Sequence, residues 1–588
     1  MGLNLALKAH SEGNLVLAEE QYKRALDQNT NSHVLYQNYG ALLRSLERID
    51  ESIKCYQTGL DKYPNNVDIM LNYANILRES HPVSSLELYL KGLILISSEL
   101  PFNNKRYLST LISCSQLMFD LGLYSWNVYF LKSVLPRVKY TAGVLLNVLL
   151  LLDRLSDKSY QINSGLCKSY ENVYRRINQS LSTLNVTERI EFHYSLFHHS
   201  LLQGKNDDAF SEFDKANKLA SEAIDDSSVD QKKLQNLIDC HHWNGANTLL
   251  KIQDFDKGWK YYEYGLRAPC SGPQRWQRSL AKPFTSSQVQ LWKGESLKGK
   301  RLLLLEEQGI GDAMMFISLV PALIKEATNI GLFLSDRLLA IYKRSFKNEI
   351  ESGSISVFSR DQFYHRVLQA NMYDFQSPMG SVCQYRFHHP SDYSPRPNLL
   401  SPDQDLVQQY RKTYLSQSNI VPTKIVGISW RGGAKATRMK QKSVDTKYFF
   451  DLMKLFPDIL FVSLQYGESK KITDSWKASG INVIHDDSIN PLKNMDTWIS
   501  QVAACDAVVS VANTTIHGAG GLNIPTICLL SKHSDWRWID SPDVQRSYWY
   551  PSVGIARQSS DGSWSKAFND IQGWFYDKMP YPQGAISL

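Results

Sequence analysis

Three short segments of the chain place glycine, acidic, basic and hydroxyl side chains in patterns that suit chemistry. In the first, Gly309 and Gly311 lead into Asp312, which opens an apolar helix predicted over 313–323. Glycines let the backbone turn sharply and approach a ligand, and a helix start offers N–H groups to an anion. Asp312 could accept a proton from an acceptor hydroxyl. It could equally cap the helix, which is the simpler interpretation of the spacing alone.

The second segment, 427–433, is a predicted strand end that contains two adjacent glycines and runs into a group of cations. A diphosphate needs its charge neutralised while a sugar leaves it, and lysine and arginine supply that charge. We expect Arg431 and Lys442 to contact the phosphates. We expect Lys435, Arg438 and Lys440 to lie on a solvated loop instead.

The third segment follows a predicted strand over 507–511 and is rich in hydroxyls and small residues. Such a turn can present side-chain oxygens and backbone N–H groups to phosphate at a helix start. A lone histidine is more often structural, but one on the first turn of this helix is a candidate ligand. The residues we expect to bind a nucleotide sugar here are Asn513, Thr514, Thr515, His517 and Gly518.

Two further positions could hold the base or ribose of a nucleotide. Gln465 and Tyr466 follow a predicted strand over 459–464, and Asp496 lies at the start of a predicted helix, which it could simply cap. The acidic pattern DxD, typical of metal-bound nucleotide sugars, occurs at 254–256 and 403–405, and neither copy follows a predicted strand. We therefore expect no metal and no cofactor. No Ser–His–Asp, Cys–His or HExxH signature supports a hydrolase.

The elements that must position these residues begin at Arg301, where short apolar runs start to alternate with helical stretches, as in parallel βα units. In open sheets of this kind, ligands bind outside the carboxyl ends of the strands. The stretch from 359 to about 420 is predicted to be irregular, and it separates two series of strands. The predicted strands are 301–306, 330–334 and 355–358, then 425–430, 459–464, 481–485, 507–511 and 525–530.

The N-terminal part shows a different pattern, a repeat of 34 residues that pairs Tyr22 with Tyr56 and Ala25 with Gly59. Small residues and aromatics at this period are typical of stacked helix pairs. Residues 13–26 and 47–60 are predicted second helices of such pairs, and further units are predicted at 204–216 and 242–264. Between 95 and 190 the pattern is helical but degenerate, and residues 267–300 are predicted to be a linker.

The totals exclude several classes of protein. A length of 588 residues requires several domains, and a net charge of +7 without a long basic run gives no support for nucleic-acid binding. The eight cysteines are spread singly, which suits a reducing compartment. The first residues show no signal peptide, and the apolar run 144–152 is shorter than a membrane span, so we expect a cytoplasmic protein without an integral membrane segment.

Many blocks in one order resemble a known family: tetratricopeptide-repeat (TPR) proteins that carry a glycosyltransferase domain related to the lipopolysaccharide heptosyltransferases of family 9. These blocks include GWKYYE, PQRW, LWKGESLKGKRLLLLEEQGIGD, YDFQSPMGS, VGISWRGG, SLQYG, VSVANTTIHGAGGLNIPTICLL, DWRW and YWYPSV, between about 242 and 557. The resemblance implies a GT-B architecture and inverting transfer without a metal. It also implies that Asp312 is the base, that Lys442 binds phosphate, and that Thr514, Thr515 and His517 form the phosphate-binding turn.

The predicted fold class is therefore α plus α/β, with a helical TPR solenoid followed by two Rossmann-like parallel-sheet lobes. We expect the array at 1–266, the linker at 267–300, an acceptor lobe at 301–420, and a donor lobe at 421–588 that ends in a closing helix. The predicted partners are a nucleotide sugar and a protein or glycan acceptor, which the concave face of the array could engage. The alternatives are a repeat scaffold whose transferase domain only binds nucleotide, and an epimerase of similar two-lobed fold.

Overall fold

The computed structural model describes residues 2–134, 174–175, 178–179, 181–267, 278 and 282–582, apart from 13, 29, 47, 79, 100–104, 203–204, 363–366, 394–395, 433–441, 468, 532–533 and 539–543. The chain forms two compact units, Met1–Leu234 and Gln235–Leu588.

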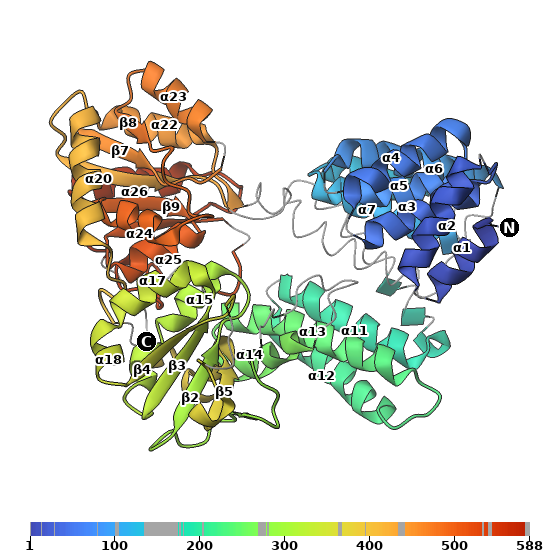
Figure 1. Cartoon of the computed structure of the whole chain (residues 1–588), viewed down its shortest axis with the longest axis horizontal. Helices are drawn as coiled ribbons and strands as arrows, with labels where there is room; N and C mark the ends of the chain where they lie inside the picture. The colour runs from blue at the N-terminus through green and yellow to red at the C-terminus, as the bar shows by residue number, and fades with distance from the viewer. Residues whose placement is uncertain are drawn as a thin grey trace. The chain divides into compact units, whose positions relative to one another are not determined.

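The first unit is built from helices that pack in consecutive pairs (Figure 1). They are α1 (Gly2–Ser11), α2 (Leu15–Asp27), α3 (His33–Ser45), α4 (Ile49–Lys62), α5 (Val67–Leu77), α6 (Pro82–Glu99), α7 (Lys105–Asp120), α8 (Tyr124–Val134), α11 (Val186–Leu202) and α12 (Asn206–Ala223). Helices α2, α4 and α12 are the second members of their pairs, which confirms three of the predicted repeat helices.

The small residues of the 34-residue repeat are the points where paired helices approach closely. A Cβ on Gly59 would lie 2.7 Å from the Cβ of Tyr36 on the preceding helix. Ala25 and Ala74 are fully buried, and so is the aromatic ring of Tyr22. About half of the degenerate stretch at 95–190, including the apolar run 144–152, lies outside the described residues.

The second unit contains two parallel sheets, each in its own lobe. The first lobe orders its strands β1-β5-β2-β3-β4. These are β1 (Gln290–Leu291), β2 (Arg301–Leu305), β3 (Asn329–Leu334), β4 (Ile355–Ser359) and β5 (Phe375–Pro378). Both faces of β2 are covered, because Leu302 and Leu304 pack into one core cluster and Leu303 and Leu305 into another.

The second lobe orders its strands β11-β10-β9-β6-β7-β8, again all parallel. They are β6 (Lys424–Ser429), β7 (Ile459–Ser463), β8 (Val483–His485), β9 (Ala507–Val511), β10 (Thr526–Leu530) and β11 (Val553–Arg557). The sequence thus predicted the position of every strand in β2–β4 and β6–β10, and the predicted α plus α/β class is confirmed.

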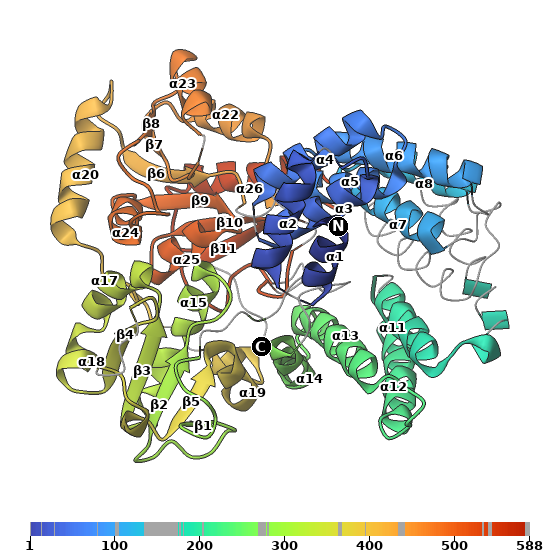
Figure 2. The ribbon, with the colours of Figure 1, turned by 45° about the vertical axis from the view of Figure 1, so that its right-hand side comes forward.

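Helices cover both sheets (Figure 2). In the second unit they are α14 (Phe255–Tyr262), α15 (Ile310–Ile317), α16 (Val320–Leu323), α17 (Asp336–Ser345), α18 (Lys347–Glu351), α19 (Cys383–Arg386), α20 (Gln404–Gln417), α22 (Thr446–Leu455), α23 (Lys470–Ala478), α24 (Met495–Ala503), α25 (Thr514–Gly521) and α26 (Ser565–Tyr576). Helix α13 (Gln231–Lys251) runs across the boundary between the units. Among the described residues, no helix has the length and apolar character that a membrane span requires.

Each sheet has one point where the chain changes direction. In the first lobe the chain runs from β2 outward to β4 and then returns to β5 on the other side of β2. In the second lobe it runs from β6 outward to β8 and then returns to β9 on the other side of β6. Such switch points leave a crevice at the carboxyl ends of the two central strands, which is where ligands bind in open α/β sheets.

Four elements differ from the sequence prediction. Strands β1, β5 and β11 and helix α20 fall where a linker, an irregular stretch or no element was predicted. β5 is short and ends in Pro378, so it carries no alternating pattern. α20 buries only Tyr414 along its length and therefore has little apolar period to detect.

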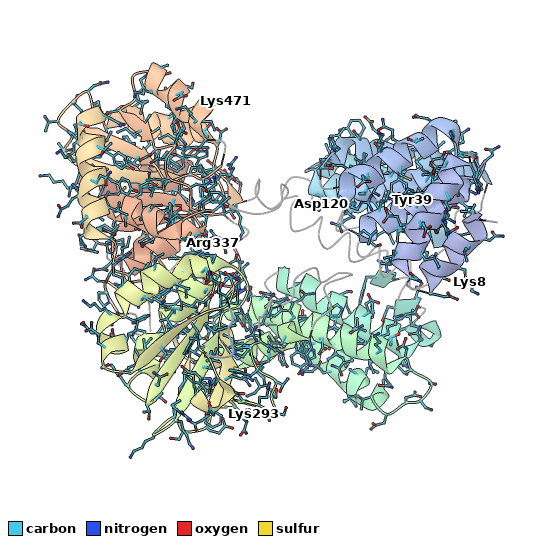
Figure 3. The ribbon with its side chains drawn as sticks, viewed as in Figure 1. Lys8, Tyr39, Asp120, Lys293, Arg337 and Lys471 are labelled. Atoms are coloured by element: carbon cyan, nitrogen blue, oxygen red, sulfur yellow. The ribbon has the colours of Figure 1, made fainter. Side chains whose placement is uncertain are left out.

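Contacts across the second unit hold its lobes together. Arg344 of α17 forms a bidentate ion pair with Asp496 of α24. Arg337, which is labelled where the lobes meet in Figure 3, donates through Nη2 to the carbonyl oxygen of Pro491 at 2.8 Å. One core cluster includes side chains of both sheets together with Trp243 of α13 and Trp259 of α14. The last repeat-like helices therefore share the core of the two-lobed unit.

Candidate active site

The two switch points face each other, because the helices that follow β2 and β9 meet at their N-termini. Helix α15 lies beside α25 in both views (Figures 1 and 2). A Cβ on Gly311 would lie 3.0 Å from Cδ2 of His517 and 3.6 Å from Oγ1 of Thr514. The structure thus brings the glycine turn and the threonine–histidine turn together between the lobes.

The glycines of the first turn are required because other groups approach them closely, and not because their backbone angles are unusual. The left-handed residue is Gln308, with φ of 58°, and Gly309 is extended with φ of −101°. Gly309 is the N-cap of α15 and donates its N–H to Oδ2 of Asp312 at 3.1 Å. Asp312 therefore lies inside the first turn and stabilises the helix start, while its Oδ1 faces the second lobe. Gly311 is needed because His517 approaches it so closely.

Arg537 of the second lobe binds Oδ1 of Asp312, the oxygen that does not accept from Gly309. Its Nε donates to Oδ1 of Asp312 at 2.5 Å, and its Nη2 forms a further contact with the same oxygen. Arg537 Nη1 lies 3.3 Å from Oδ2 of Asp535, and Nζ of Lys442 lies 2.9 Å from that oxygen. Four charges of alternating sign therefore run from the first lobe into the second.

The protonation states of this group follow from burial and from the neighbouring charges. Burial acts to raise the pKa of Asp535, but Arg537 and Lys442 outweigh it and hold that pKa far below its ordinary value. Burial acts to lower the pKa of Arg537, but Asp312 and Asp535 outweigh it and raise that pKa. Asp535 is therefore charged, and Arg537 cannot act as an acid.

His517 is buried beside this group and is neutral at neutral pH. Desolvation lowers its pKa to about 4, although the carboxylate of Asp312 acts in the opposite direction. Its Nδ1 lies 3.3 Å from the hydroxyl oxygen of Tyr550. A neutral imidazole at this place can accept or donate one hydrogen bond without adding charge.

Several predicted ligands instead support the turns from within the second lobe. Oε1 of Gln465 accepts from the backbone N–H of Arg431 at 2.8 Å, and Nε2 of Gln465 donates to the carbonyl oxygen of Tyr466. Asn513 caps α25 through the N–H of Thr515 and donates to Oγ of Ser429 at 2.9 Å. These bonds tie the carboxyl end of β6 to those of β7 and β9.

Of the remaining predicted residues, some lie at the site and others serve packing or ion pairs within the protein. Arg431 donates to the carbonyl oxygen of Tyr466 at 3.0 Å, and Gly432 packs against the stem of Lys442. Asp496 neither caps its helix, which Asn494 does, nor is free, since it pairs with Arg344. A Cβ on Gly518 would lie 2.9 Å from the ring of Trp498, so this glycine serves helix packing.

Asp535 and Arg537 are functional residues without a predicted role. They belong to the block DWRW, which follows β10 in the chain. The available signal was the alternation of charge and tryptophan, because Trp536 and Trp538 are both buried and leave the two charged residues at alternate positions. The predicted cations Lys435, Arg438 and Lys440 lie outside the described residues.

The last repeat-like helix also reaches the site. Tyr262 of α14 accepts a hydrogen bond from Nε2 of Gln308, whose Oε1 accepts from Nη2 of Arg537 at 3.3 Å. The ring of Trp536 packs edge-on against Trp259 and Tyr262 of the same helix, with centroids 5.4 and 5.3 Å away. The guanidinium of Arg537 lies 4.6 Å above the ring of Trp536. Helix α14 therefore buttresses the loop that carries Arg537.

A small hollow of about 10 Å³ adjoins Lys442 in the second lobe. Its wall also includes Ala512, Ser531, Ser534, Asp535 and Trp538. Leu529 and Leu530 complete the wall, so charged, hydroxyl, aromatic and aliphatic side chains all line it.

Both DxD copies lie at helix starts. Asp254 caps α14, and Asp403 caps α20. In the part of the chain that the structure describes, no three His, Cys, Asp or Glu side chains gather as a metal site would require.

The chain matches no family model. It is 25% identical over 334 residues to Protein FlbA of Caulobacter vibrioides, a match that covers 55% of this chain. The match covers 53% of that protein, so the chain spans about half the length of this relative.

Similar solved structures represent both kinds of protein that the sequence resembles. One is a tetratricopeptide repeat protein from Parabacteroides merdae (16% identity, TM-score 0.32, 45% of this chain and 90% of that chain). Another is the E. coli ADP-heptose LPS heptosyltransferase II (14% identity, TM-score 0.33, 48% of this chain and 100% of that chain). Both TM-scores are below 0.5, so the fold is defined by the strand orders of the two sheets and by the paired helices.

Proposed function

We propose that this protein is a glycosyltransferase that moves a sugar from a nucleotide-diphosphate sugar to an acceptor hydroxyl with inversion. The observation that carries the proposal is the meeting of two switch-point turns, one with a carboxylate and one with hydroxyls, beside two cations. A transfer of this kind needs a base on the acceptor side and positive charge on the leaving-group side.

Asp312 is the proposed base. It takes the proton of the acceptor hydroxyl as the acceptor oxygen forms its bond to the anomeric carbon. The bond from that carbon to the diphosphate oxygen breaks, and the nucleoside diphosphate leaves with the electron pair. The single displacement inverts the configuration. The support is the placement of Asp312 on the first lobe, across the interface from Lys442 and the start of α25.

The second lobe is the proposed donor lobe. Lys442, the N-terminus of α25 at Thr514 and Thr515, and Arg431 surround the carboxyl ends of β6 and β9. Helix N-termini and lysine both stabilise phosphate. The positive charge thus comes from side chains, and we propose transfer without a metal. Activity that survives EDTA supports this part, and activity that returns only with added divalent cation refutes it.

The acceptor in this proposal is a protein or a glycan, and the first unit is a candidate for engaging it. Arrays of paired helices bind partners along extended surfaces. The sequence resemblance leaves the nucleotide open, so the proposal covers UDP, GDP and ADP sugars alike.

A second candidate is a scaffold that binds nucleotide without transferring sugar. One observation favours it: Asp312 and Lys442 are both already engaged in ion pairs. Two measurements separate the candidates. Thermal unfolding with UDP, GDP and ADP detects nucleotide binding, because a ligand at about 100 times its Kd stabilises a protein by about 2.7 kcal/mol. A panel of nucleotide sugars then detects turnover. Stabilisation without turnover of any sugar supports the scaffold, and no stabilisation refutes both.

A further inference from the structure

The alternating charges between the lobes occupy the carboxylate of the proposed base, Asp312. Both oxygens of Asp312 already accept hydrogen bonds, Oδ1 from Arg537 at 2.5 Å and Oδ2 from the N–H of Gly309 at 3.1 Å. The Gly309 bond is part of the start of α15 and is local. The Arg537 bond crosses the lobes. An acceptor hydroxyl can therefore reach an oxygen of Asp312 most readily if Arg537 moves.

A second set of partners for the guanidinium of Arg537 lies on its own lobe. Its Nη1 already lies 3.3 Å from Oδ2 of Asp535, and that same oxygen binds Nζ of Lys442 at 2.9 Å. Lys442 and Asp535 also line the small hollow of about 10 Å³. Asp535 thus keeps near each other two cations that would otherwise repel.

The group is partly exposed. The exposed fractions of the four side chains are 15% for Asp312, 18% for Arg537, and 29% for both Asp535 and Lys442. A diphosphate carries more negative charge and more acceptor oxygens than a carboxylate, and guanidinium binds phosphate through two parallel hydrogen bonds. A diphosphate at Lys442 is therefore a stronger partner for Arg537 than Asp312 is.

We propose that Arg537 is a second diphosphate-binding cation that Asp312 holds in the donor-free protein, so that donor binding draws Arg537 away and frees Asp312 to accept the acceptor proton. The inference rests on the proposed function and deepens it. Asp535 is a positioning residue that keeps Arg537 and Lys442 at one spacing. The base thereby becomes available only when the leaving group is in place.

The aromatic packing of the loop allows a short movement of this kind. Trp536 is buried against α14, and Nε1 of Trp549 donates to the carbonyl oxygen of Arg537 at 3.0 Å. These contacts fix the backbone of the loop, so the change is confined to the side chain of Arg537. Rotation of one side chain is enough to exchange partners at a distance of a few ångströms.

Competition between Asp312 and the diphosphate has a direct consequence for affinity. If Asp312 holds Arg537 in the free protein, removing its charge lowers the cost of drawing Arg537 onto phosphate. We expect Asp312→Asn to bind nucleoside diphosphate about 10-fold more tightly than the wild type, a typical size for coupling between linked sites. We expect Arg537→Gln to bind it about 10-fold more weakly. The double variant Asp312→Asn/Arg537→Gln is expected to match Arg537→Gln, because the gain passes through Arg537.

Isothermal titration of the full chain with UDP, GDP and ADP in turn measures these affinities. The matched control is Asp374→Asn, another carboxylate paired with an arginine, Arg301 at 3.2 Å, at the amino end of β2. Its affinity is expected to equal that of the wild type. Thermal unfolding of each variant shows whether it is folded, and Arg537→Lys tests whether charge alone restores binding.

The outcomes separate this inference from the function on which it rests. Tighter binding by Asp312→Asn that disappears in the double variant supports the exchange. Unchanged or weaker binding by Asp312→Asn, or a gain that persists without Arg537, overturns the exchange while the glycosyltransferase proposal stands. If none of the three nucleotides binds the wild type, both proposals fall together.

Discussion

Gly311 marks the closest approach of the two turns, and its replacement by alanine tests whether that approach serves transfer. The added Cβ would lie 3.0 Å from Cδ2 of His517, 3.4 Å from its Nε2 and 3.6 Å from Oγ1 of Thr514. Carbon atoms pack best at about 3.5–4.0 Å, so α15 and α25 must separate by about 0.5–1 Å. His517 cannot turn aside freely, because it is buried and contacts Tyr550.

That displacement falls on the proposed base and the proposed phosphate turn together. Because misplacement of reacting groups by about 1 Å can cost about 100-fold in rate, we expect Gly311→Ala to lower kcat/KM by about 10- to 100-fold. This corresponds to about 1.4–2.7 kcal/mol of transition-state stabilisation. Stability is expected to change by less than about 1 kcal/mol, since alanine favours a helix over glycine by about that amount and offsets the close contact.

The assay is steady-state turnover of the nucleotide sugar that proves to be the donor, with thermal unfolding measured in parallel. Gly573→Ala is the matched control, because Gly573 also lies inside a helix, α26, with nothing within 4 Å of its added Cβ. It is expected to keep wild-type turnover and to gain about 0.5–1 kcal/mol in stability. Turnover of Gly311→Ala within twofold of the wild type would refute the reasoning, because the two turns would then not share one reacting geometry.

Other residues of the site give further expectations. Asp312→Ala is expected to lower transfer by at least about 100-fold through loss of the base, while nucleotide binding is not weakened and thermal unfolding is retained; near wild-type turnover contradicts the assignment. Lys442→Ala is expected to weaken nucleoside diphosphate binding by about 10-fold in titration, whereas the exposed Lys447→Ala is not; equal affinities remove Lys442 from the phosphate site. His517 has a folded pKa of about 4, below the ordinary value of 6.5, so the unfolded chain binds its proton more tightly. Its contribution to stability is complete above about pH 6.5 and is lost as the pH falls towards 4, by up to about 3 kcal/mol. His517→Asn is expected to lose less stability as the pH falls, and the remaining loss is expected to come from groups such as His242, whose pKa is also about 4. A pH dependence of stability equal to that of the wild type contradicts this expectation.

Much of the fold could be predicted because local pattern and long-range packing agree. Strands β2 and β6 are apolar runs covered on both faces, so they read as strands without knowledge of their neighbours. The repeat could be read because the approach of paired helices requires a small residue at a fixed period, as at Gly59. β11 could not, because it contains Gly554 and its pairing with β10 is decided by a neighbour distant in the sequence.

The candidate site also has a part that could be predicted from the sequence and a part that could not. Topology places the ends of central strands at one edge of a sheet, so the turns at Gly311 and Thr514 could be foreseen as candidates from strand order alone. The partner of a charged side chain is decided instead by how two lobes meet. Asp312 and Arg537 are 225 positions apart, and no local signal separates a helix-start carboxylate that waits for a ligand from one that bridges the lobes. Asp496 shows the same ambiguity with the opposite outcome, since it lies in the first turn of α24 and pairs with Arg344. In a two-lobed protein, therefore, the charges that cross the interface are the part of a site that sequence reasoning must leave to the structure. In the proposed exchange, they are also the part on which access to Asp312 depends.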